Sequence, residues 1–257
     1  MTDPASNDPG CIDRPGGHRL AYHATPGALP GVIFLGGFMS DMTGTKAMAL
    51  EAHCRVRSQA FLRFDYLGHG QSSGAFADGT IGRWADDAIA ALDQLTEGPQ
   101  ILVGSSMGGW IMLLAALARP QRAVGLIGIA AAPDFTEDIM RNRFDDGQRE
   151  TLAADGKVLI PSDYGDGEPY IVSRALIEDG RDNLLLVGDI AIDCPVRLLQ
   201  GMKDTDVPWR TALAVADKLT GDDVEITLVK HGDHRLSEPT DLARLGRTLD
   251  RLIDEVT

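Results

Sequence analysis

Short apolar runs alternate along this chain with segments in which apolar residues recur every three or four positions. The short runs are typical of buried strands, and the periodic segments are typical of amphipathic helices. We expect strands at residues 32–35, 60–64, 101–103, 124–131, 195–200 and 224–229, and helices at residues 44–57, 81–95, 107–119, 209–219 and 242–256. Strands that alternate with helices form right-handed crossovers and a mostly parallel, doubly wound sheet with helices on both faces. The sequence therefore predicts the α/β fold class.

The alternation is interrupted between residues 134 and 193, where charged residues, glycines and prolines are frequent. Domains commonly hold about 100–200 residues, and α/β folds often exceed that as one unit. We therefore expect a single domain over residues 1–257, with a small lid insertion of short helices at residues 134–193. In a doubly wound sheet the functional groups lie in the loops beyond the carboxyl ends of the strands, so candidate residues are sought there.

Acidic residues exceed basic ones, since 38 Asp and Glu against 24 Lys and Arg give a net charge of −14. This balance disfavours non-specific binding to nucleic acid, because the phosphate groups would be repelled. The three cysteines lie far apart without a Cys-x-x-Cys pair, so neither a zinc site nor a disulfide framework is indicated. We expect no nucleic-acid partner, no metal and no cofactor.

Residues 101–118 carry no charge and approach the length of a membrane span. Their interior, GSSMGG, is a poor continuous helix, so we interpret the run as a buried strand followed by a buried helix. The segment MTDPASNDPG lacks the basic and apolar regions of a signal peptide and the Arg-rich character of a transit peptide. We expect no membrane span and a cytoplasmic location.

A Gly-x-Ser-x-Gly pattern lies between an expected strand and an expected helix. At such a sharp turn the residues two before and two after the serine face each other, so glycine belongs at both places. Ser106 has Gly104 and Gly108 there, whereas Ser105 has larger residues on both sides. We predict that Ser106 is a nucleophile.

A serine nucleophile needs an imidazole to accept its proton and a carboxylate to orient that imidazole. The base should follow the last strand, where His231 adjoins the strand and His234 lies farther out, and we favour His234. Asp204 is the first carboxylate beyond the preceding strand and is the predicted acid. Asp206 is a nearby alternative for the acid, although it could instead be a helix-start residue. Asp134 is a less favoured alternative for the acid. The order serine, acid, histidine is a known order for such triads.

The oxyanion of a tetrahedral intermediate needs preorganised N–H donors. Met107 directly follows Ser106 at an expected helix N-terminus, and Phe38 lies in the loop after the strand at residues 32–35. We predict that the backbone N–H groups of Phe38 and Met107 form the oxyanion hole.

These motifs resemble the α/β-hydrolase superfamily over nearly the whole chain, from Leu20 to the last helix. The segment FDYLGHGQS is similar to a structural D-x-x-G-x-G-x-S segment of that superfamily. A closer resemblance is to the mammalian mitochondrial family of palmitoyl-protein thioesterases and mycophenolic acid acyl-glucuronide esterases. It is carried by GTKAMAL, RFDYLGHGQSSG, GPQILVGSSMGGWIMLLAALARP, CPVRLLQGMKDTDVPW and HGDHR. On that pattern Ser106, Asp204 and His234 match the triad, whereas Gly36-Gly37 stands where a His-Gly pair is common.

The triad and the resemblance together imply a serine hydrolase that cleaves esters or thioesters through an acyl-enzyme, on a small-molecule or acylated-protein substrate. Alternatives on the same fold are a carbon–carbon bond hydrolase, a lyase and a binding module. Candidates for an acyl slot in the insertion are Ile139, Met140, Phe144, Leu159, Ile160, Tyr164 and Tyr170. Candidates for contacts with an acidic substrate are Arg141, Arg143 and Arg174.

Overall fold

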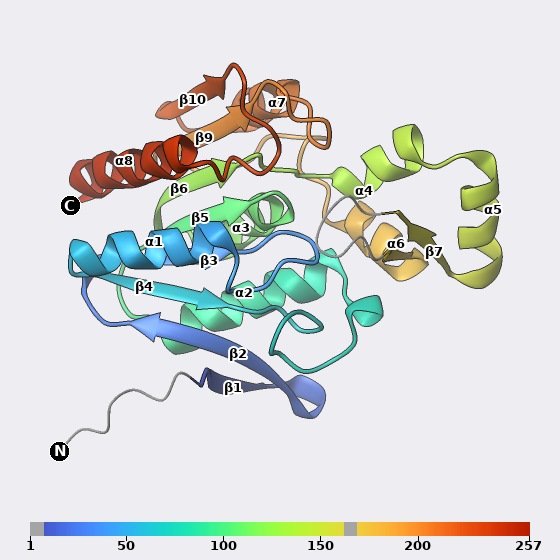
Figure 1. Cartoon of the computed structure of the whole chain (residues 1–257), viewed down its shortest axis with the longest axis horizontal. Coiled ribbons are helices and arrows are strands. Elements are labelled where there is room, and N and C mark those ends of the chain that lie inside the picture. Colours follow the sequence, from blue (N-terminus) through green and yellow to red (C-terminus); the bar gives the residue numbers. More distant parts are fainter. Residues whose placement is uncertain (1–7, 162–168) are drawn as a thin grey trace.

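Eight strands in the described part of the chain form one sheet in the order β1-β2-β4-β3-β5-β6-β9-β10 (Figure 1). This computed structural model describes residues 8–161 and 169–257. The strands are β1 (Gly10–Arg14), β2 (His18–Thr25), β3 (Ala28–Leu35), β4 (Gln59–Phe64), β5 (Gln100–Ser105), β6 (Ala123–Ile129), β9 (Val196–Gly201) and β10 (Val224–Val229). Neighbours from β4 to β10 are parallel, which confirms the predicted sheet. β1 and β2 add an antiparallel edge that was not predicted.

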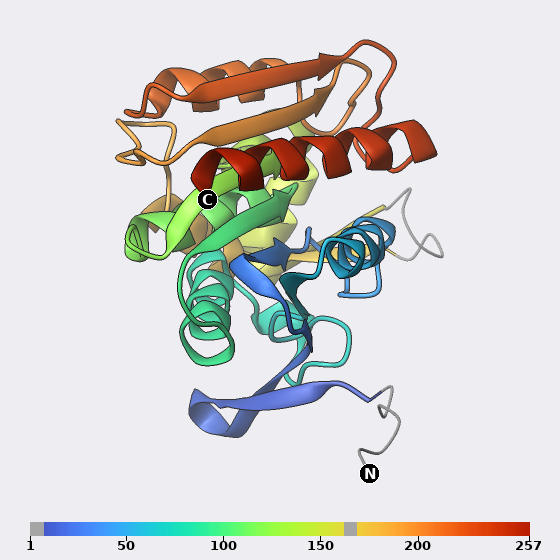
Figure 2. The same ribbon diagram turned by 90° about the vertical axis from the view of Figure 1, so that its left-hand side faces the viewer.

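Helices cover both faces of this sheet (Figure 2). On one face lie α1 (Thr45–Val56) and α8 (Pro239–Val256), and on the other α2 (Ile81–Leu95), α3 (Met107–Ala118) and α7 (Arg210–Lys218). Along β3, Val32 and Phe34 join the core on the α1 face, while Ile33 and Leu35 join the core on the α3 face. Burial of both faces explains why the strands read as continuous apolar runs.

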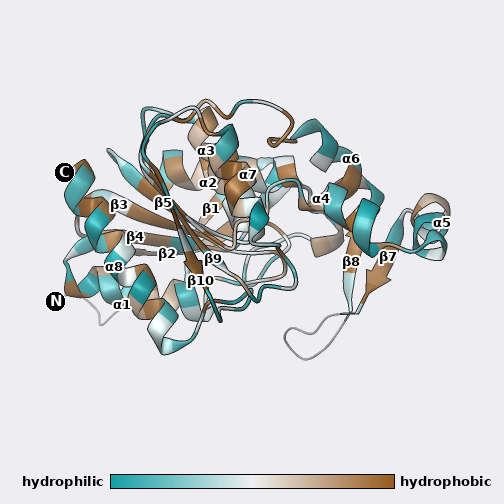
Figure 3. Cartoon of the chain, turned by 90° about the horizontal axis from the view of Figure 1, so that it is seen from above, coloured by the Kyte–Doolittle hydropathy of each residue, from teal (hydrophilic) through white to brown (hydrophobic). Residues whose placement is uncertain are grey.

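The charge-free run at residues 101–118 divides into β5 and α3, as its glycines predict. Figure 3 shows the hydrophobic strands β3, β4 and β5 between α2 and α3 on one side and α1 and α8 on the other. Trp110 and Ile111 of α3 are fully buried. None of the described helices is both long and apolar enough to cross a membrane.

Between β6 and β9 the chain leaves the sheet and forms short elements to one side of it (Figure 1). They are α4 (Phe135–Asp138), the π-helical turn η3 (Ile139–Arg143), α5 (Asp146–Asp155), β7 (Lys157–Ile160), β8 (Tyr170–Ser173) and α6 (Arg174–Asp182). β7 and β8 pair as a second, antiparallel sheet, which the sequence patterns did not predict. Two short 3-10 turns elsewhere are η1 (Pro15–Gly17) and η2 (Phe76–Asp78).

A buried ion pair joins α1 to β4. Glu51 Oε2 lies 2.7 Å from Arg63 Nε, and the two side chains are only 7% and 8% exposed. Glu51 Oε1 also accepts hydrogen bonds from Arg55 and Thr25. Burial alone raises the pKa of Glu51, but the hydrogen bonds from Arg55, Arg63 and Thr25 outweigh burial and bring the pKa to about 2.

We expect Glu51→Gln to lower the free energy of unfolding by about 3 kcal/mol at neutral pH, because Arg63 stays buried without its counter-charge. The folded-state pKa is lowered, so this contribution is complete above the ordinary value of 4.5 and is lost as the pH falls towards 2. Urea unfolding of wild type and Glu51→Gln at about pH 7 and about pH 3 measures the difference in the free energy of unfolding.

The control is Asp254→Asn, which removes an exposed partner of Arg57 and should change the unfolding free energy by less than about 0.5 kcal/mol. Equal losses in the two variants, or a Glu51→Gln loss that does not shrink at acid pH, contradict this assignment.

Candidate active site

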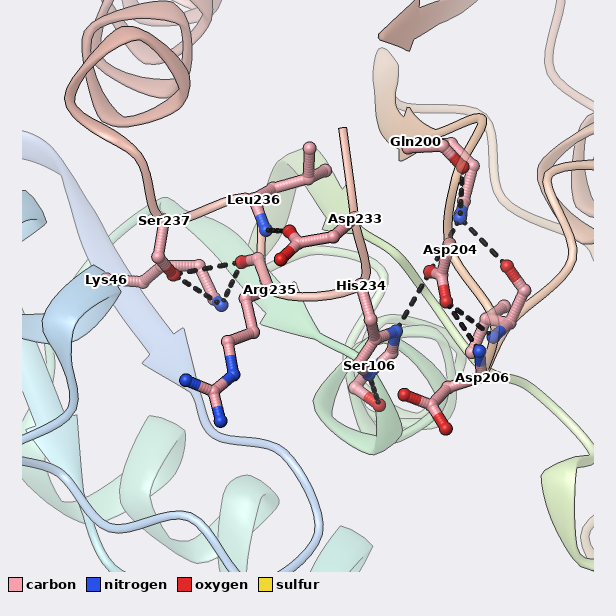
Figure 4. A network of polar contacts seen from close by, with 12 residues as sticks. Lys46, Ser106, Gln200, Asp204, Asp206, Asp233, His234, Arg235, Leu236 and Ser237 are labelled. Atoms are coloured by element: carbon pink, nitrogen blue, oxygen red, sulfur yellow. Dashed lines mark hydrogen bonds and ion pairs between the residues drawn. The ribbon is translucent and has the colours of Figure 1, made fainter. Parts of the chain in front are cut away.

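The loops that follow β5, β9 and β10 meet at one edge of the sheet and carry Ser106, Asp204 and His234 (Figure 4). Ser106 Oγ lies 3.1 Å from His234 Nε2, and His234 Nδ1 lies 2.9 Å from Asp204 Oδ2. The structure thus brings the three residues predicted as a triad into one hydrogen-bonded chain.

Ser106 forms the turn from β5 into α3 with φ 54° and ψ −120°, a costly conformation for a residue with a side chain. A Cβ atom at Gly104 would lie 2.3 Å from the carbonyl oxygen of Gly108. A Cβ atom at Gly108 would lie 2.1 Å from the carbonyl oxygen of Leu35. Glycine is sterically required at both positions, although Gly108 is crowded by β3 rather than by Gly104.

The carboxylate of Asp204 is fully buried and held on both oxygens. Oδ1 accepts the backbone N–H groups of Asp206 and Val207, each at 2.8 Å. Oδ2 accepts from His234 Nδ1 and, at 2.9 Å, from Gln200 Nε2. The carboxylate of Asp204 is therefore fixed in one orientation.

The alternative residues lie in other environments. Asp206 is not a helix-start residue, because α7 begins later, and its Oδ1 lies 3.3 Å from Arg143 Nη1. Asp134 accepts two consecutive backbone N–H groups of the segment that leads to β9, each at 2.9 Å. Burial raises the pKa of Asp134. His231 is exposed. None of these three takes the place of Asp204 or His234 in the chain of hydrogen bonds described above.

The two predicted oxyanion donors border Ser106. A Cβ atom on Gly37, next to Phe38, would lie 3.4 Å from Ser106 Cβ, so this loop passes close to the serine. The Phe38 ring packs on Phe76, Trp84, Phe135 and Tyr170, with centroids 4.8–5.9 Å apart. Met107 is the first residue of α3, so its backbone N–H has no acceptor within the helix. Both residues line the pocket that Ser106 lines, and their role as donors stays a prediction.

Ser106 opens into a pocket of about 540 Å³. Small-molecule sites commonly have volumes of about 300–1,000 Å³. The lining residues from the insertion and from the loop after β9 are Phe135, Ile139, Tyr170 and Val207, which are apolar or aromatic, and Asp138, Arg143 and Asp206, which are charged. Those that precede or begin α1, or follow His234, are mostly polar and include Ser40, Asp41, Thr45, Lys46, Arg235 and Ser237. The insertion side of the pocket is therefore apolar apart from the paired charges of Asp138, Arg143 and Asp206, and the α1 side is more polar.

Of the insertion residues named from the sequence, Ile139, Arg143 and Tyr170 line the pocket. Arg143 also lies 3.6 Å from Asp138 Oδ2, in addition to its pair with Asp206. The other two candidate arginines are not among the lining residues. Arg141 pairs with Glu137, and Arg174 donates to the backbone carbonyl of Ala153. The described residues that line the pocket do not include four of the predicted acyl-slot residues, Met140, Phe144, Leu159 and Ile160. Tyr164 lies outside the described residues.

The loop that carries His234, called here the histidine loop, is hydrogen-bonded to α1 by a contact that the sequence does not predict. Lys46 Nζ donates to the carbonyl of Arg235 at 2.6 Å and to Ser237 Oγ at 3.4 Å (Figure 4). Burial lowers the pKa of Lys46 to about 8, with Asp233 acting in the opposite direction. The main acceptor is a backbone carbonyl 189 positions away, so no residue pattern marks the pair.

One group of potential metal ligands lies here, since Asp204, Asp206 and His234 offer atoms within 4.8 Å of one another. Two of them already bond to each other through Oδ2 and Nδ1, and Oδ1 of Asp204 is held by two N–H groups. This donor set fits an oriented acid–imidazole pair and does not fit a metal centre.

The strand order, the serine at the β5–α3 turn, and the carboxylate and histidine after β9 and β10 define an α/β hydrolase. A family model described as "alpha/beta hydrolase fold" matches residues 32–166. The chain belongs to this family and is an α/β-hydrolase enzyme.

The chain is similar to "Palmitoyl-protein thioesterase ABHD10, mitochondrial" of Homo sapiens, with 43% identity over 246 residues that cover 96% of this chain and 80% of that protein. Among solved structures, alpha/beta hydrolase domain-containing protein 10 from mouse has a TM-score of 0.90 and 41% identity, covering 98% of this chain and 100% of that one. A putative hydrolase from Agrobacterium vitis S4 has a TM-score of 0.91 and 42% identity, covering 96% and 98%.

These relatives contradict one expectation from the sequence. The N-terminal segment suggested a cytoplasmic location, but the relatives from human, cattle and rat are named as mitochondrial proteins, which contradicts that expectation. The composition of a short segment is a weak guide, because targeting signals are read by receptors independently of the folded domain.

Proposed function

We propose that this enzyme hydrolyses thioesters and esters with apolar acyl groups through a Ser106–His234–Asp204 triad and a covalent acyl-enzyme. The observation that carries the proposal is the unbroken chain of hydrogen bonds from Ser106 Oγ to Asp204 Oδ2 at the wall of a 540 Å³ pocket. Nucleophile, base and orienting acid within hydrogen-bond reach are the geometric signature of nucleophilic acyl transfer.

In the acylation step, Ser106 Oγ attacks the acyl carbon while His234 Nε2 accepts the hydroxyl proton. The carbonyl oxygen becomes an oxyanion and accepts hydrogen bonds from the N–H groups of Phe38 and Met107. Collapse of the tetrahedral intermediate breaks the bond to the leaving sulfur or oxygen, which takes the proton from His234.

In the deacylation step, His234 accepts a proton from water as the water oxygen attacks the acyl-enzyme. The second intermediate releases the carboxylic acid, and Ser106 regains its proton from His234. Asp204 accepts the Nδ1–H hydrogen bond throughout, which fixes the tautomer and stabilises the imidazolium. After one cycle the enzyme has the same protons as at the start, and water is the only reactant besides the substrate.

The pocket supports an apolar acyl group on the side of Phe135, Ile139 and Tyr170 and a polar leaving group on the side of α1 and the histidine loop. A thioester substrate is supported by the similarity to palmitoyl-protein thioesterase ABHD10. We also propose that residues 134–193 act as a lid within a single domain over residues 1–257. Phe135, Ile139 and Tyr170 of this insertion border the pocket, and Arg143 links it to Asp206.

We expect turnover of both p-nitrophenyl esters and acyl thioesters, with kcat/KM rising with acyl length. Each additional buried methylene contributes about 0.8 kcal/mol, or about fourfold in kcat/KM, until the apolar side of the pocket is full. Steady-state rates on both substrate classes from two to sixteen acyl carbons, about the range of biological acyl groups, measure this. Turnover of neither class, or a rate independent of acyl length, refutes the proposal.

A further inference from the structure

Gln200 has a buried side chain next to the proposed acid. It lies near the end of β9, is only 1% exposed, and its amide reaches the loop that carries Asp204 (Figure 4). Nε2 donates to Asp204 Oδ2 at 2.9 Å and to the carbonyl oxygen of Val207 at 3.1 Å. One amide thus ties both ends of the four-residue segment 204–207 to the strand.

The chemistry of the neighbours fixes the orientation of this amide. The carboxylate and the Val207 carbonyl are acceptors only, so each requires an N–H group. A flipped amide would place Oε1 against both oxygens. The orientation with Nε2 towards Asp204 therefore follows from the surroundings.

This orientation leaves the other end of the amide without a partner. Gln200 Oε1 is buried, and no group in the described part of the chain donates to it. A buried acceptor without a donor lowers stability, whereas an apolar side chain of similar length carries no such cost. The gain from a glutamine at this position therefore lies in what Nε2 does for Asp204 Oδ2 and for the Val207 carbonyl.

We propose that Gln200 is a positioning residue of the triad: its amide keeps Asp204 Oδ2 directed at His234 Nδ1. Oδ1 of Asp204 is already held by the N–H groups of Asp206 and Val207. With Gln200 as the additional donor, rotation of the carboxylate breaks a hydrogen bond on either oxygen. Gln200 acts through Asp204, and this inference rests on the proposed function.

The test is Gln200→Met, which keeps the length and volume of the side chain and removes the amide. We expect kcat to fall by on the order of ten- to a hundredfold, because a misplacement of about 1 Å in a catalytic group costs up to about a hundredfold. KM should be unchanged, and the melting temperature should fall, as in the control below, because the Val207 carbonyl and Asp204 Oδ2 each lose a donor. A merely structural role for Gln200 predicts the same lower melting temperature with kcat retained.

The matched control is Gln59→Met. Gln59 is also a buried glutamine on a strand, 4% exposed, and its Nε2 donates to the carbonyls of Ala28 and Pro30 far from the triad. The Gln59→Met substitution should lower the melting temperature and leave kcat unchanged. If Gln200→Met does not fold, Gln200→Leu removes the amide with a smaller apolar side chain, and the same loss of kcat is expected.

The rate of Ser106 labelling by a fluorophosphonate probe separates this inference from the proposed function. If wild type turns over neither substrate class, the proposed function fails, and slower labelling of Gln200→Met than of Gln59→Met still supports the positioning role. If wild type is active and the Gln200 variants keep the wild-type kcat and labelling rate, the positioning role is refuted and the proposed function stands.

Discussion

Ser106→Ala is expected to lower kcat on esters and thioesters by on the order of 10⁵–10⁶-fold, because no acyl-enzyme can form without the hydroxyl. Labelling by a fluorophosphonate probe should disappear together with turnover. The substitution removes one oxygen from a half-buried side chain, so the melting temperature should stay close to that of wild type. Labelling with intact-protein mass spectrometry and steady-state kinetics measure both effects.

Ser105→Ala is the matched control for this experiment. Ser105 is the last residue of β5, is 7% exposed and borders the same pocket, but it does not occupy the turn that directs Ser106 Oγ at His234. It should keep most of the activity and all of the labelling. Persistent labelling of Ser106→Ala, or its loss in Ser105→Ala, would overturn the choice between the two serines.

Asp204→Asn is expected to lower kcat by about 10⁴-fold with little change in KM. The physical reason is tautomeric. The N–H groups of Asp206 and Val207 fix an acceptor at the Oδ1 position, so the amide oxygen of asparagine takes that place and its NH₂ group faces His234. Nδ1 must then accept, Nε2 carries the proton, and His234 no longer accepts a proton from Ser106.

The control here is Asp206→Asn. It keeps the backbone N–H that Asp204 accepts and changes only the carboxylate that pairs with Arg143, so kcat should change by less than about tenfold. kcat measured for both variants on one ester and one thioester decides between the two carboxylates. A mild effect at Asp204 with a severe one at Asp206 would assign the acid to Asp206.

The central sheet could be predicted because its strands are buried on both faces. β3, β5 and β6 therefore appear in the sequence as short apolar runs, and the helices between them show helical spacing. The edge strands β1 and β2 carry mixed exposed and buried residues, so they give no such run. The small sheet of β7 and β8 has only four residues in each strand, too few for a periodic pattern.

The choice of Ser106 also followed from local sterics. Glycines two residues before and after the serine are required by contacts with backbone oxygens at 2.1–2.3 Å, which any side chain would violate. The roles of Lys46, Arg143 and Gln200 could not be predicted in the same way. Each of the three side chains donates to a backbone carbonyl, and a carbonyl is present at every residue of the chain, so it leaves no mark in the sequence.

The sequence by itself determined the fold class and singled out a serine, a carboxylate and a histidine, because turn sterics and strand order are written in short stretches of chain. Only the tertiary structure decided that these groups meet. Ser106 and His234 are 128 positions apart, and their hydrogen bond depends on the register of parallel strands and on the backbone N–H groups that orient Asp204. Such contacts arise when distant strands align, so no local pattern of residues encodes them.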